Sequence, residues 1–230
     1  MPNLLLSKCS FHSKIEFDKM KIVKLLNFWE TKKLLEKYRI PFCQSCLVQT
    51  KKEALKEADR IGYPLVLKIS SPKVLHRSEI GGVKVGIRNK EELEKAFEEM
   101  EKIPGEKEGI ILQKMLSGIE VAMGVKRDPQ FGPVLLFGLG GIFIELLEDI
   151  SLRICPVSQR EARKMILEIK GARIFFGFRN LPKVEIKTLA QTLVSLSQLA
   201  VGEREIREID LNPVICRGEE IKVVDAKFLR

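Results

Sequence analysis

The sequence lacks several features that mark particular classes of protein. Its 230 residues include one Trp, two Tyr and two His, and aromatic residues make up only 7%, so we expect a mainly aliphatic core. No apolar run approaches the roughly 18 residues that a membrane-spanning helix needs. The start, residues 1–10, has no long apolar segment followed by a small-residue cleavage site, which a secretory signal would require. We therefore expect a cytoplasmic protein without membrane contact.

Cysteine is also too sparse to define a framework. The chain has five cysteines, and an odd number without a secretory signal argues against a set of disulfides. Cys43 and Cys46 form a C-x-x-C motif, but no second Cys or His pair follows, and a structural zinc site needs four ligands. We interpret these two residues as ordinary loop cysteines.

The charge is positive but dispersed. Forty basic and 31 acidic residues give a net charge of +9, with the excess in residues 1–50 and 151–200. Basic residues are mixed with acidic ones, as in Lys51-Lys52-Glu53, which is typical of solvated helix faces. Nucleic-acid binding would favour basic residues gathered on one element and interleaved with aromatics, so we expect no nucleic-acid partner. An anionic small ligand would use the same charge.

Apolar periodicity, capping residues and turn residues predict an α+β protein in two lobes. Helices are expected over residues 26–38, 51–61, 90–102, 158–170 and 182–200. Strands are expected over 65–69, 83–88, 109–115, 119–126, 134–137, 142–147, 151–155, 206–210, 214–216 and 220–225. The lobes would join near residues 115–118.

Lys68 and the glycine turn that follows it are the first candidates for a site. A lysine in an apolar strand either extends to solvent at a sheet edge or points into a cleft and holds phosphate. Gly81 and Gly82 would let backbone N–H groups approach an anion closely, although a plain hairpin turn uses the same residues. His76 precedes the turn; it is either an exposed loop histidine or a nucleophile that carries a phosphoryl group.

Carboxylates supply the second group of candidates. Glu145 follows a Gly-rich segment that no helix continues, which excludes a dinucleotide fingerprint, and it is either functional or a paired structural group. Period two places Glu208, Asp210 and Asn212 on one strand face, and Asp225 lies on the next predicted strand. Such oxygens suit Mg²⁺; the alternative is the charged outer face of an edge strand.

These pieces resemble a known family. Segments 63–68, 81–85, 113–116, 118–120 and 210–213, with Asp225, resemble an ATP-grasp nucleotide site. Segments 71–78, 128–133 and 137–143 are similar to the β subunit of ADP-forming acetyl-CoA synthetase (acetate–CoA ligase), a relative of succinyl-CoA synthetase. The resemblance covers about residues 25–228 and departs from the family at residues 177–180, where Gly-Phe-Arg-Asn replaces Gly-x-Arg-Gly.

The resemblance implies an ATP-grasp fold, in which two α/β lobes enclose a nucleotide cleft. Residues 20–115 would form an N-terminal helix and the first lobe with a phosphate-covering loop, and residues 116–230 a second lobe with the metal site. Residues 1–19 lie outside the match, and we expect a flexible extension there.

The family also implies roles for individual residues. Phosphate contacts would come from Lys68 and from the covering loop with Ser78, Gly81 and Gly82. The adenine would lie against Gln113, Lys114, Met115 and Leu116, and the ribose hydroxyls against Glu120. Mg²⁺ would be held by Asp210, Asn212 and Asp225. His76 would be the phosphohistidine, with Glu145 near the transferred phosphate.

The implied function is that of a ligase subunit that binds ATP or ADP. The reaction is reversible: acyl-CoA, ADP and phosphate give carboxylate, CoA and ATP. A CoA-binding α subunit would supply the earlier steps, in an α2β2 heterotetramer. One alternative is another ATP-grasp carboxylate ligase that acts through an acyl phosphate and does not need His76. The other is a non-catalytic nucleotide-binding or nucleic-acid-binding module, which predicts no phosphate on His76.

Overall fold

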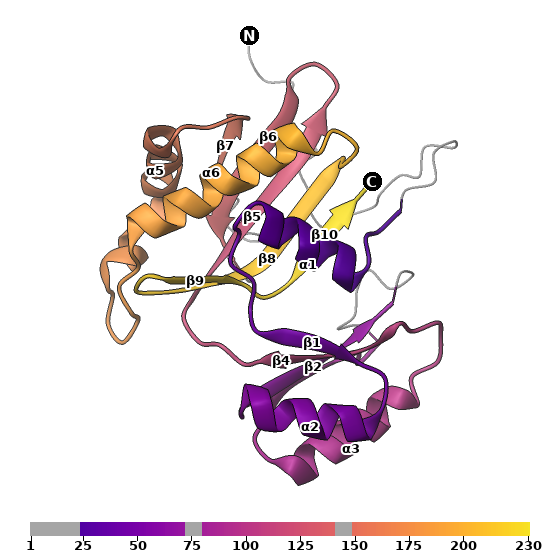
Figure 1. The fold of residues 1–230 in the computed structure, drawn as a ribbon. Helices are drawn as coiled ribbons and strands as arrows, with labels where there is room; N and C mark the ends of the chain where they lie inside the picture. The colour runs from indigo at the N-terminus through magenta and orange to yellow at the C-terminus, as the bar shows by residue number, and fades with distance from the viewer. Residues whose placement is uncertain (1–23, 72–79, 141–148) are drawn as a thin grey trace.

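The computed structural model describes residues 24–71, 80–140 and 149–230, and the chain there forms two antiparallel sheets (Figure 1). The first sheet has the strand order β1-β4-β2-β3. The second has the order β10-β8-β5-β6-β7, with β9 paired to β8. The strands of the first sheet are β1 (Ser45–Val48), β2 (Leu65–Ser70), β3 (Val83–Ile87) and β4 (Gly109–Lys114). Those of the second are β5 (Ile119–Asp128), β6 (Gly132–Leu139), β7 (Ile150–Ile154), β8 (Glu208–Arg217), β9 (Glu220–Val223) and β10 (Ala226–Leu229).

Capping residues set the starts of three helices where the sequence predicted them. Helix α2 (Lys51–Ile61) begins after Thr50, whose side chain accepts a hydrogen bond from the Glu53 amide, and Gly62 follows its end with φ of 78°. Asn89 caps α3 (Lys90–Glu101) and Ser158 caps α5 (Gln159–Glu168) in the same way. Each cap satisfies an amide that the first helical turn leaves without a partner.

The first sheet is two-sided. Leu65, Leu67 and Ile69 point to α2 and α3 and form a small core with Phe97 and Leu93. The residues between them, including Lys68, point to the opposite face, which Gln113 of β4 shares because it pairs with Val66. This face is turned toward the second sheet (Figure 1).

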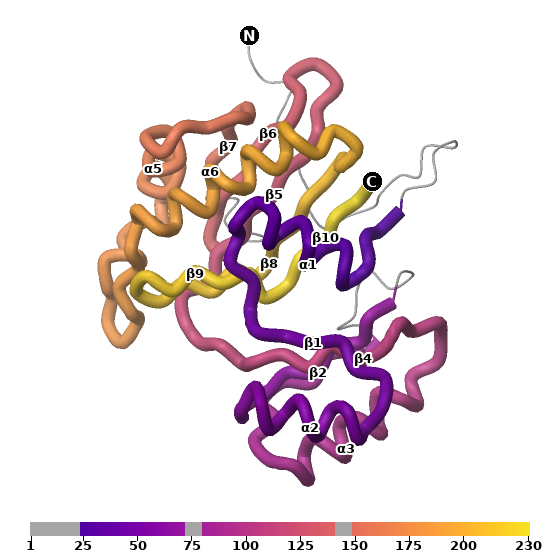
Figure 2. The backbone as a smooth tube through the Cα atoms, in the orientation of Figure 1, coloured from indigo at the N-terminus to yellow at the C-terminus, as the bar shows by residue number. Residues whose placement is uncertain are grey.

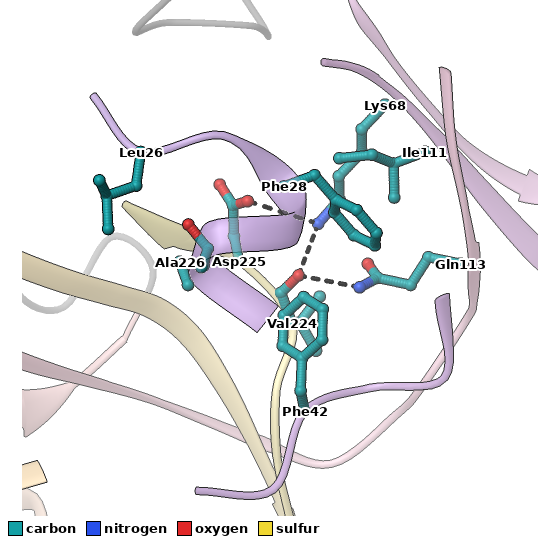
Figure 3. Close-up of a pocket in the computed structure, with 10 residues that line it drawn as sticks. Leu26, Phe28, Phe42, Lys68, Ile111, Gln113, Val224, Asp225 and Ala226 are labelled. Carbon is teal, nitrogen blue, oxygen red and sulfur yellow. Dashed lines mark hydrogen bonds and ion pairs between the residues drawn. The ribbon is translucent and has the colours of Figure 1, made fainter. Parts of the chain in front are cut away.

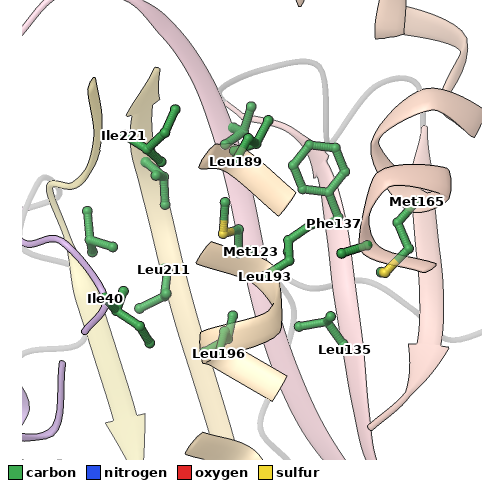
Figure 4. Close-up of a cluster of buried hydrophobic side chains, with 14 of the residues drawn as sticks. Ile40, Met123, Leu135, Phe137, Met165, Leu189, Leu193, Leu196, Leu211 and Ile221 are labelled. Atoms are coloured by element: carbon green, nitrogen blue, oxygen red, sulfur yellow. The ribbon is translucent and has the colours of Figure 1, made fainter. Parts of the chain in front are cut away.

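The larger core lies between the second sheet and its helices (Figure 4). Helix α6 (Ile186–Gly202) crosses β5 and β6, so that Leu193 packs near Met123 and Phe137. Leu211 of β8 joins the same cluster and is fully buried. None of the helices in the described part of the chain combines the length and the apolar character required to cross a membrane.

Helix α1 (Phe28–Lys37) belongs to this larger core. Leu35 and Ile40 are buried in it, and the Tyr38 hydroxyl donates a hydrogen bond of 2.9 Å to Glu203 behind α6. The structure therefore differs from the expected grouping of residues 20–115, because the N-terminal helix packs on the second sheet. The chain changes sheets between Lys114 and Ile119, where the sequence placed the junction.

Several element predictions were wrong or incomplete. β1, β10 and the 3₁₀ helix η1 (Lys170–Phe176) were not predicted. Helix α6 begins at Ile186 instead of residue 182, since Val184 bridges to Gly218 and the Glu185 amide bonds to the Gly218 carbonyl. β8 runs through residues 212–213 as one strand with a register shift against β5. The strand predicted over residues 142–147 lies outside the described residues. β7, which the sequence predicted over residues 151–155, pairs with β6.

Candidate functional site

A small cavity lies where the first sheet meets the second (Figure 3). Its volume is about 30 Å³, which is room for about one water molecule. Lys68 and Gln113 enter it from the first sheet, while Val224 and Asp225 enter from the segment between β9 and β10. The remaining lining residues are Leu26, Phe28, Thr31, Phe42, Ile111 and Ala226.

Lys68 points into this junction. The residue is 7% exposed, and its Nζ donates a hydrogen bond of 2.9 Å to the Val224 carbonyl and lies 3.9 Å from Oδ1 of Asp225. A buried ammonium requires such partners, because its desolvation is costly. β2 lies between β4 and β3, so the alternative of a lysine that extends to solvent from an edge strand is excluded.

Gln113 meets the same carbonyl from β4. Its Nε2 donates to Val224 O at 3.0 Å, so that this carbonyl accepts from two side chains of the first sheet. The residue is 1% exposed, and its Oε1 is a buried atom without a hydrogen-bond partner within the described part of the protein. An orphaned buried acceptor is costly, so it calls for a hydrogen-bond donor in the cavity, from a water molecule or from a ligand.

The predicted metal ligands lie on the second sheet. Asp210 and Asn212 alternate along β8 with the buried Ile209 and Leu211, as period two predicted. β8 lies between β10 and β5, so the alternative of an outer face on an edge strand is excluded.

Asp225 follows β9 instead of lying on it, so its predicted place on a strand was wrong. Its amide donates to the Pro213 carbonyl at 3.4 Å, and Pro213 directly follows Asn212. The backbone thus joins the two segments that carry the predicted ligands.

Among the described residues no three His, Cys, Asp or Glu side chains form a metal cluster. Two carboxylates and an amide still fit Mg²⁺, which takes few protein ligands and fills its shell with phosphate oxygens and water.

The predicted adenine-lining segment divides into residues that face the cavity and residues that do not. Beside Gln113, the Lys114 side chain turns away and donates to the carbonyls of Gly62 and Tyr63 at 2.9 and 2.8 Å. Met115 is partly exposed, and its amide bonds to the Pro64 carbonyl. Leu116 is half-buried. Of these four side chains, only that of Gln113 lines the cavity.

The glycine turn lies beside Lys68. Lys68 pairs with Val83 in the β2–β3 register, and the Gly82 carbonyl accepts from the Ile69 amide at 2.9 Å. Gly81 has φ of 69°, a conformation that side chains rarely adopt. The structure therefore brings the two parts of the predicted phosphate clamp together.

Glu120 is exposed on β5. Its carbonyl accepts from the Gly140 amide at 2.9 Å, and a Cβ on Gly140 would lie 3.1 Å from that carbonyl carbon. The second Gly-rich segment thus packs closely against β5. His76, Ser78 and Glu145 lie outside the described residues.

Two parts of the site were missed by the sequence. The first is the Val224 carbonyl, which the sequence could not indicate because every residue has a backbone carbonyl. Phe28 and Thr31 line the cavity from one face of α1, three residues apart. That spacing could have identified their shared face, but not what the face covers.

The cysteines are free thiols where the structure describes them. Cys43 is buried and its Sγ donates to the Lys114 carbonyl at 3.2 Å, while Cys46 lies on β1, so the loop interpretation was wrong for Cys46. Burial raises the pKa of both thiols to about 11. Both are therefore protonated and unreactive near neutral pH.

Comparisons with known proteins point to one family. The sequence model of the ATP-grasp domain family matches residues 20–229. The chain is 41% identical over 207 residues to "Acetate--CoA ligase [ADP-forming] I subunit beta" of Pyrococcus furiosus, covering 87% of this chain and 89% of that one. It is 40% identical to "Acetate--CoA ligase [ADP-forming] I" of Archaeoglobus fulgidus, with 85% of this chain covering 30% of that longer protein.

Solved structures agree with this. A structure of dinucleotide-forming acetyl-coenzyme A synthetase 1 from Ca. Korarchaeum cryptofilum, in complex with coenzyme A, Ca-AMPCP and HgCl+, is 41% identical. It has a TM-score of 0.85 over 90% of this chain and 93% of that one. Another structure of that protein contains coenzyme A and Mg-AMPPCP, with its phosphohistidine segment pointing towards the nucleotide binding site; its TM-score is 0.78 at 41% identity, over 90% of this chain and 92% of that one.

Proposed function

The chain belongs to the ATP-grasp family, as the sequence resemblance indicated, and from this premise we propose that it is the nucleotide-binding β subunit of an ADP-forming acyl-CoA ligase. The reaction would be the reversible conversion of acyl-CoA, ADP and phosphate to a carboxylate, CoA and ATP. The fold is the expected α+β ATP-grasp fold.

One observation carries the proposal. Lys68 and Gln113 of the first sheet converge with Asp225, which lies between β9 and β10, on a single junction (Figure 3). A buried cation, a carboxylate and a buried acceptor that no described residue satisfies thus lie together between two sheets. A nucleoside diphosphate with its cation offers the complementary groups: negative phosphates, an amino group on the base and a positive ion.

Each of these groups has a role in the proposal. Lys68 neutralises phosphate charge beside the turn of Gly81 and Gly82, and Gln113 accepts a hydrogen bond from the adenine. Asp210, Asn212 and Asp225 would hold Mg²⁺, which supplies charge neutralisation to phosphoryl transfer when bound. The cavity of about 30 Å³ is far smaller than ligand pockets of roughly 300 Å³ or more, so the nucleotide must also occupy space beyond it.

The remaining predicted residues enter the proposal on the family's pattern. His76 would accept and release the phosphoryl group, and Glu145 would lie near it. Ser78 would belong to the loop that covers the phosphates, and Glu120 would bind the ribose. Lys114, Met115 and Leu116 would contribute through their backbone and the apolar wall.

We also propose a CoA-binding α subunit as partner, in an α2β2 heterotetramer. The Pyrococcus furiosus relative is named as a β subunit and matches this chain over most of its length. The Archaeoglobus fulgidus relative is more than three times as long as the matched region, which is consistent with the partner's domains being fused to it. A cytoplasmic location would supply the nucleotide and the acyl-CoA.

The test is reconstitution. The chain is co-expressed with candidate α subunits, and ATP formation from acyl-CoA, ADP and phosphate is measured. We expect the wild-type chain to be active with a matching α subunit and to carry an acid-labile phosphate on His76. The His76→Ala variant should lose both the activity and the phosphate. Full activity of His76→Ala would favour a ligase that acts through an acyl phosphate. ADP binding without activity in any combination would contradict the catalytic proposal.

A further inference from the structure

The segment of residues 223–225 is held from several directions at once. The Val223 amide donates to the Pro41 carbonyl at 2.8 Å, and the Val223 carbonyl accepts from the Cys43 amide at 2.9 Å. The amides of Val224 and Asp225 both donate to Pro213, at 3.0 and 3.4 Å. All of these contacts come from the backbone of the chain around the second sheet.

The Val224 carbonyl is the part of this segment that the first sheet holds. A carbonyl oxygen has two lone pairs, and here Lys68 and Gln113 supply donors at 2.9 and 3.0 Å. Nζ of Lys68 also lies 3.9 Å from Oδ1 of Asp225, so Lys68 holds the segment through both an ion pair and a hydrogen bond. Gln113 is neutral, and among the described residues its side chain reaches across the junction through the hydrogen bond to this carbonyl.

We propose that Gln113 is a positioning residue that acts through the Val224 carbonyl and so sets the place of the Asp225 carboxylate. The peptide unit between Val224 and Asp225 is planar, and the carbonyl and the Asp225 amide are its two ends. Gln113 holds one end from the first sheet, and Pro213 holds the other beside Asn212. The position of Asp225 relative to Asn212 therefore depends on the first sheet.

This inference adds a second role to Gln113, and its consequence for the cation rests on the proposed function. Its amide nitrogen is committed to Val224, while its oxygen remains available to a ligand. The two roles are separable because they use different atoms. Gln113→Glu keeps an oxygen acceptor but places a carboxylate oxygen against the Val224 carbonyl, and Gln113→Leu removes both groups.

The first experiment measures amide hydrogen exchange in the peptide that contains residues 223–226, with the complete chain and no nucleotide added. Both variants should exchange about fivefold faster there, the factor expected when one hydrogen bond is lost. Exchange in β2 and β4 should stay unchanged. Gln198→Glu makes the same chemical change on an exposed position of α6 and should match the wild type throughout.

The outcomes decide the proposal. Wild-type exchange at residues 223–226 in both variants would overturn it. Exchange raised equally in β2, β4 and this peptide would overturn it too, because Gln113 would then act through folding of the first sheet. This experiment is independent of the proposed function, since it uses no ligand.

The second experiment uses Mn²⁺ as the probe, followed by electron paramagnetic resonance in the presence of ADP. Gln113→Glu should raise the Mn²⁺ concentration for half-saturation about fivefold. This is the factor expected when the hydrogen bond to the Val224 carbonyl is lost. An unchanged concentration in that variant would overturn the link to Asp225. Absence of Mn²⁺ binding in the wild type would instead contradict the proposed function and leave the exchange result to stand by itself.

Discussion

Nζ of Lys68 lies 3.9 Å from Oδ1 of Asp225, although the two residues are far apart in the chain: Lys68 is on β2 of the first sheet, and Asp225 lies between β9 and β10 of the second. Their charges compensate each other at a site where both are largely removed from water. The pair links the predicted phosphate contact to the predicted cation contact, so substitutions at either end should affect nucleotide binding.

We predict that Lys68→Met weakens ADP binding about tenfold or more, because a buried charge-assisted hydrogen bond contributes about 1.5–3 kcal/mol. Isothermal titration calorimetry with Mg²⁺ present measures the change. Lys56→Met, which removes an exposed lysine on α2, serves as the control and should bind as the wild type does. Equal affinities in all three proteins would remove Lys68 from the site.

Asn212→Ala and Asp225→Asn should each raise the Mg²⁺ concentration needed for half-maximal ADP binding, by about tenfold. Each change removes or weakens one oxygen ligand of a hard cation. The measurement is ADP binding at limiting and at saturating Mg²⁺, with Asp59→Asn on the exposed face of α2 as the control. Unchanged binding at limiting Mg²⁺ would exclude the substituted residue as a ligand.

Two glycine substitutions should differ in their cost. A Cβ at Gly118 would lie 2.6 Å from the Cys216 carbonyl oxygen and 2.9 Å from Ile215 Cγ2, so Gly118→Ala should lower the free energy of unfolding by about 2–3 kcal/mol. Gly132 has φ of 74° but open space around it, so Gly132→Ala should cost only about 1 kcal/mol. Denaturant unfolding of both variants tests this, and equal losses would contradict it.

The thiols of Cys43 and Cys46 should resist alkylation at pH 8. Burial raises their pKa from 9.0 to about 11, so both remain protonated in the folded protein. The stability that this contributes is present below pH 9 and is lost as the pH rises from 9 toward 11. Iodoacetamide labelling read by mass spectrometry, with the urea-unfolded chain as the reference, measures the protection. Labelling of the folded protein at the unfolded rate would contradict it.

Local signals explain how much of the fold the sequence could predict. Thr50, Asn89 and Ser158 determine helix starts through contacts within four residues, so those boundaries were confirmed. β1 and β10 were missed, because they are short outer strands whose formation depends on pairing with β4 and β8.

In the candidate site, too, local signals could be predicted from the sequence and long-range contacts could not. Lys68 could be identified because its charge interrupts an apolar strand, and period two correctly placed Asp210 and Asn212 on one face. The sequence could not show that Lys114 turns to Gly62 and Tyr63 while Gln113 faces the cavity. Nor could it show the Val224 carbonyl, since only the meeting of two sheets gives that group its partners.

The two crossings of the chain between the sheets lie side by side (Figure 2). One leads from α1 to β1 and the other from β4 to β5, and the Lys114 amide donates to the Gln44 carbonyl at 2.9 Å. Residues 45–114 therefore form a cassette whose entry and exit already touch. A linker of one or two glycines between Gln44 and Met115 would bypass it, and the remaining chain would retain the whole of the larger core. The cassette is thus a unit that protein engineering could exchange between relatives without rerouting the backbone.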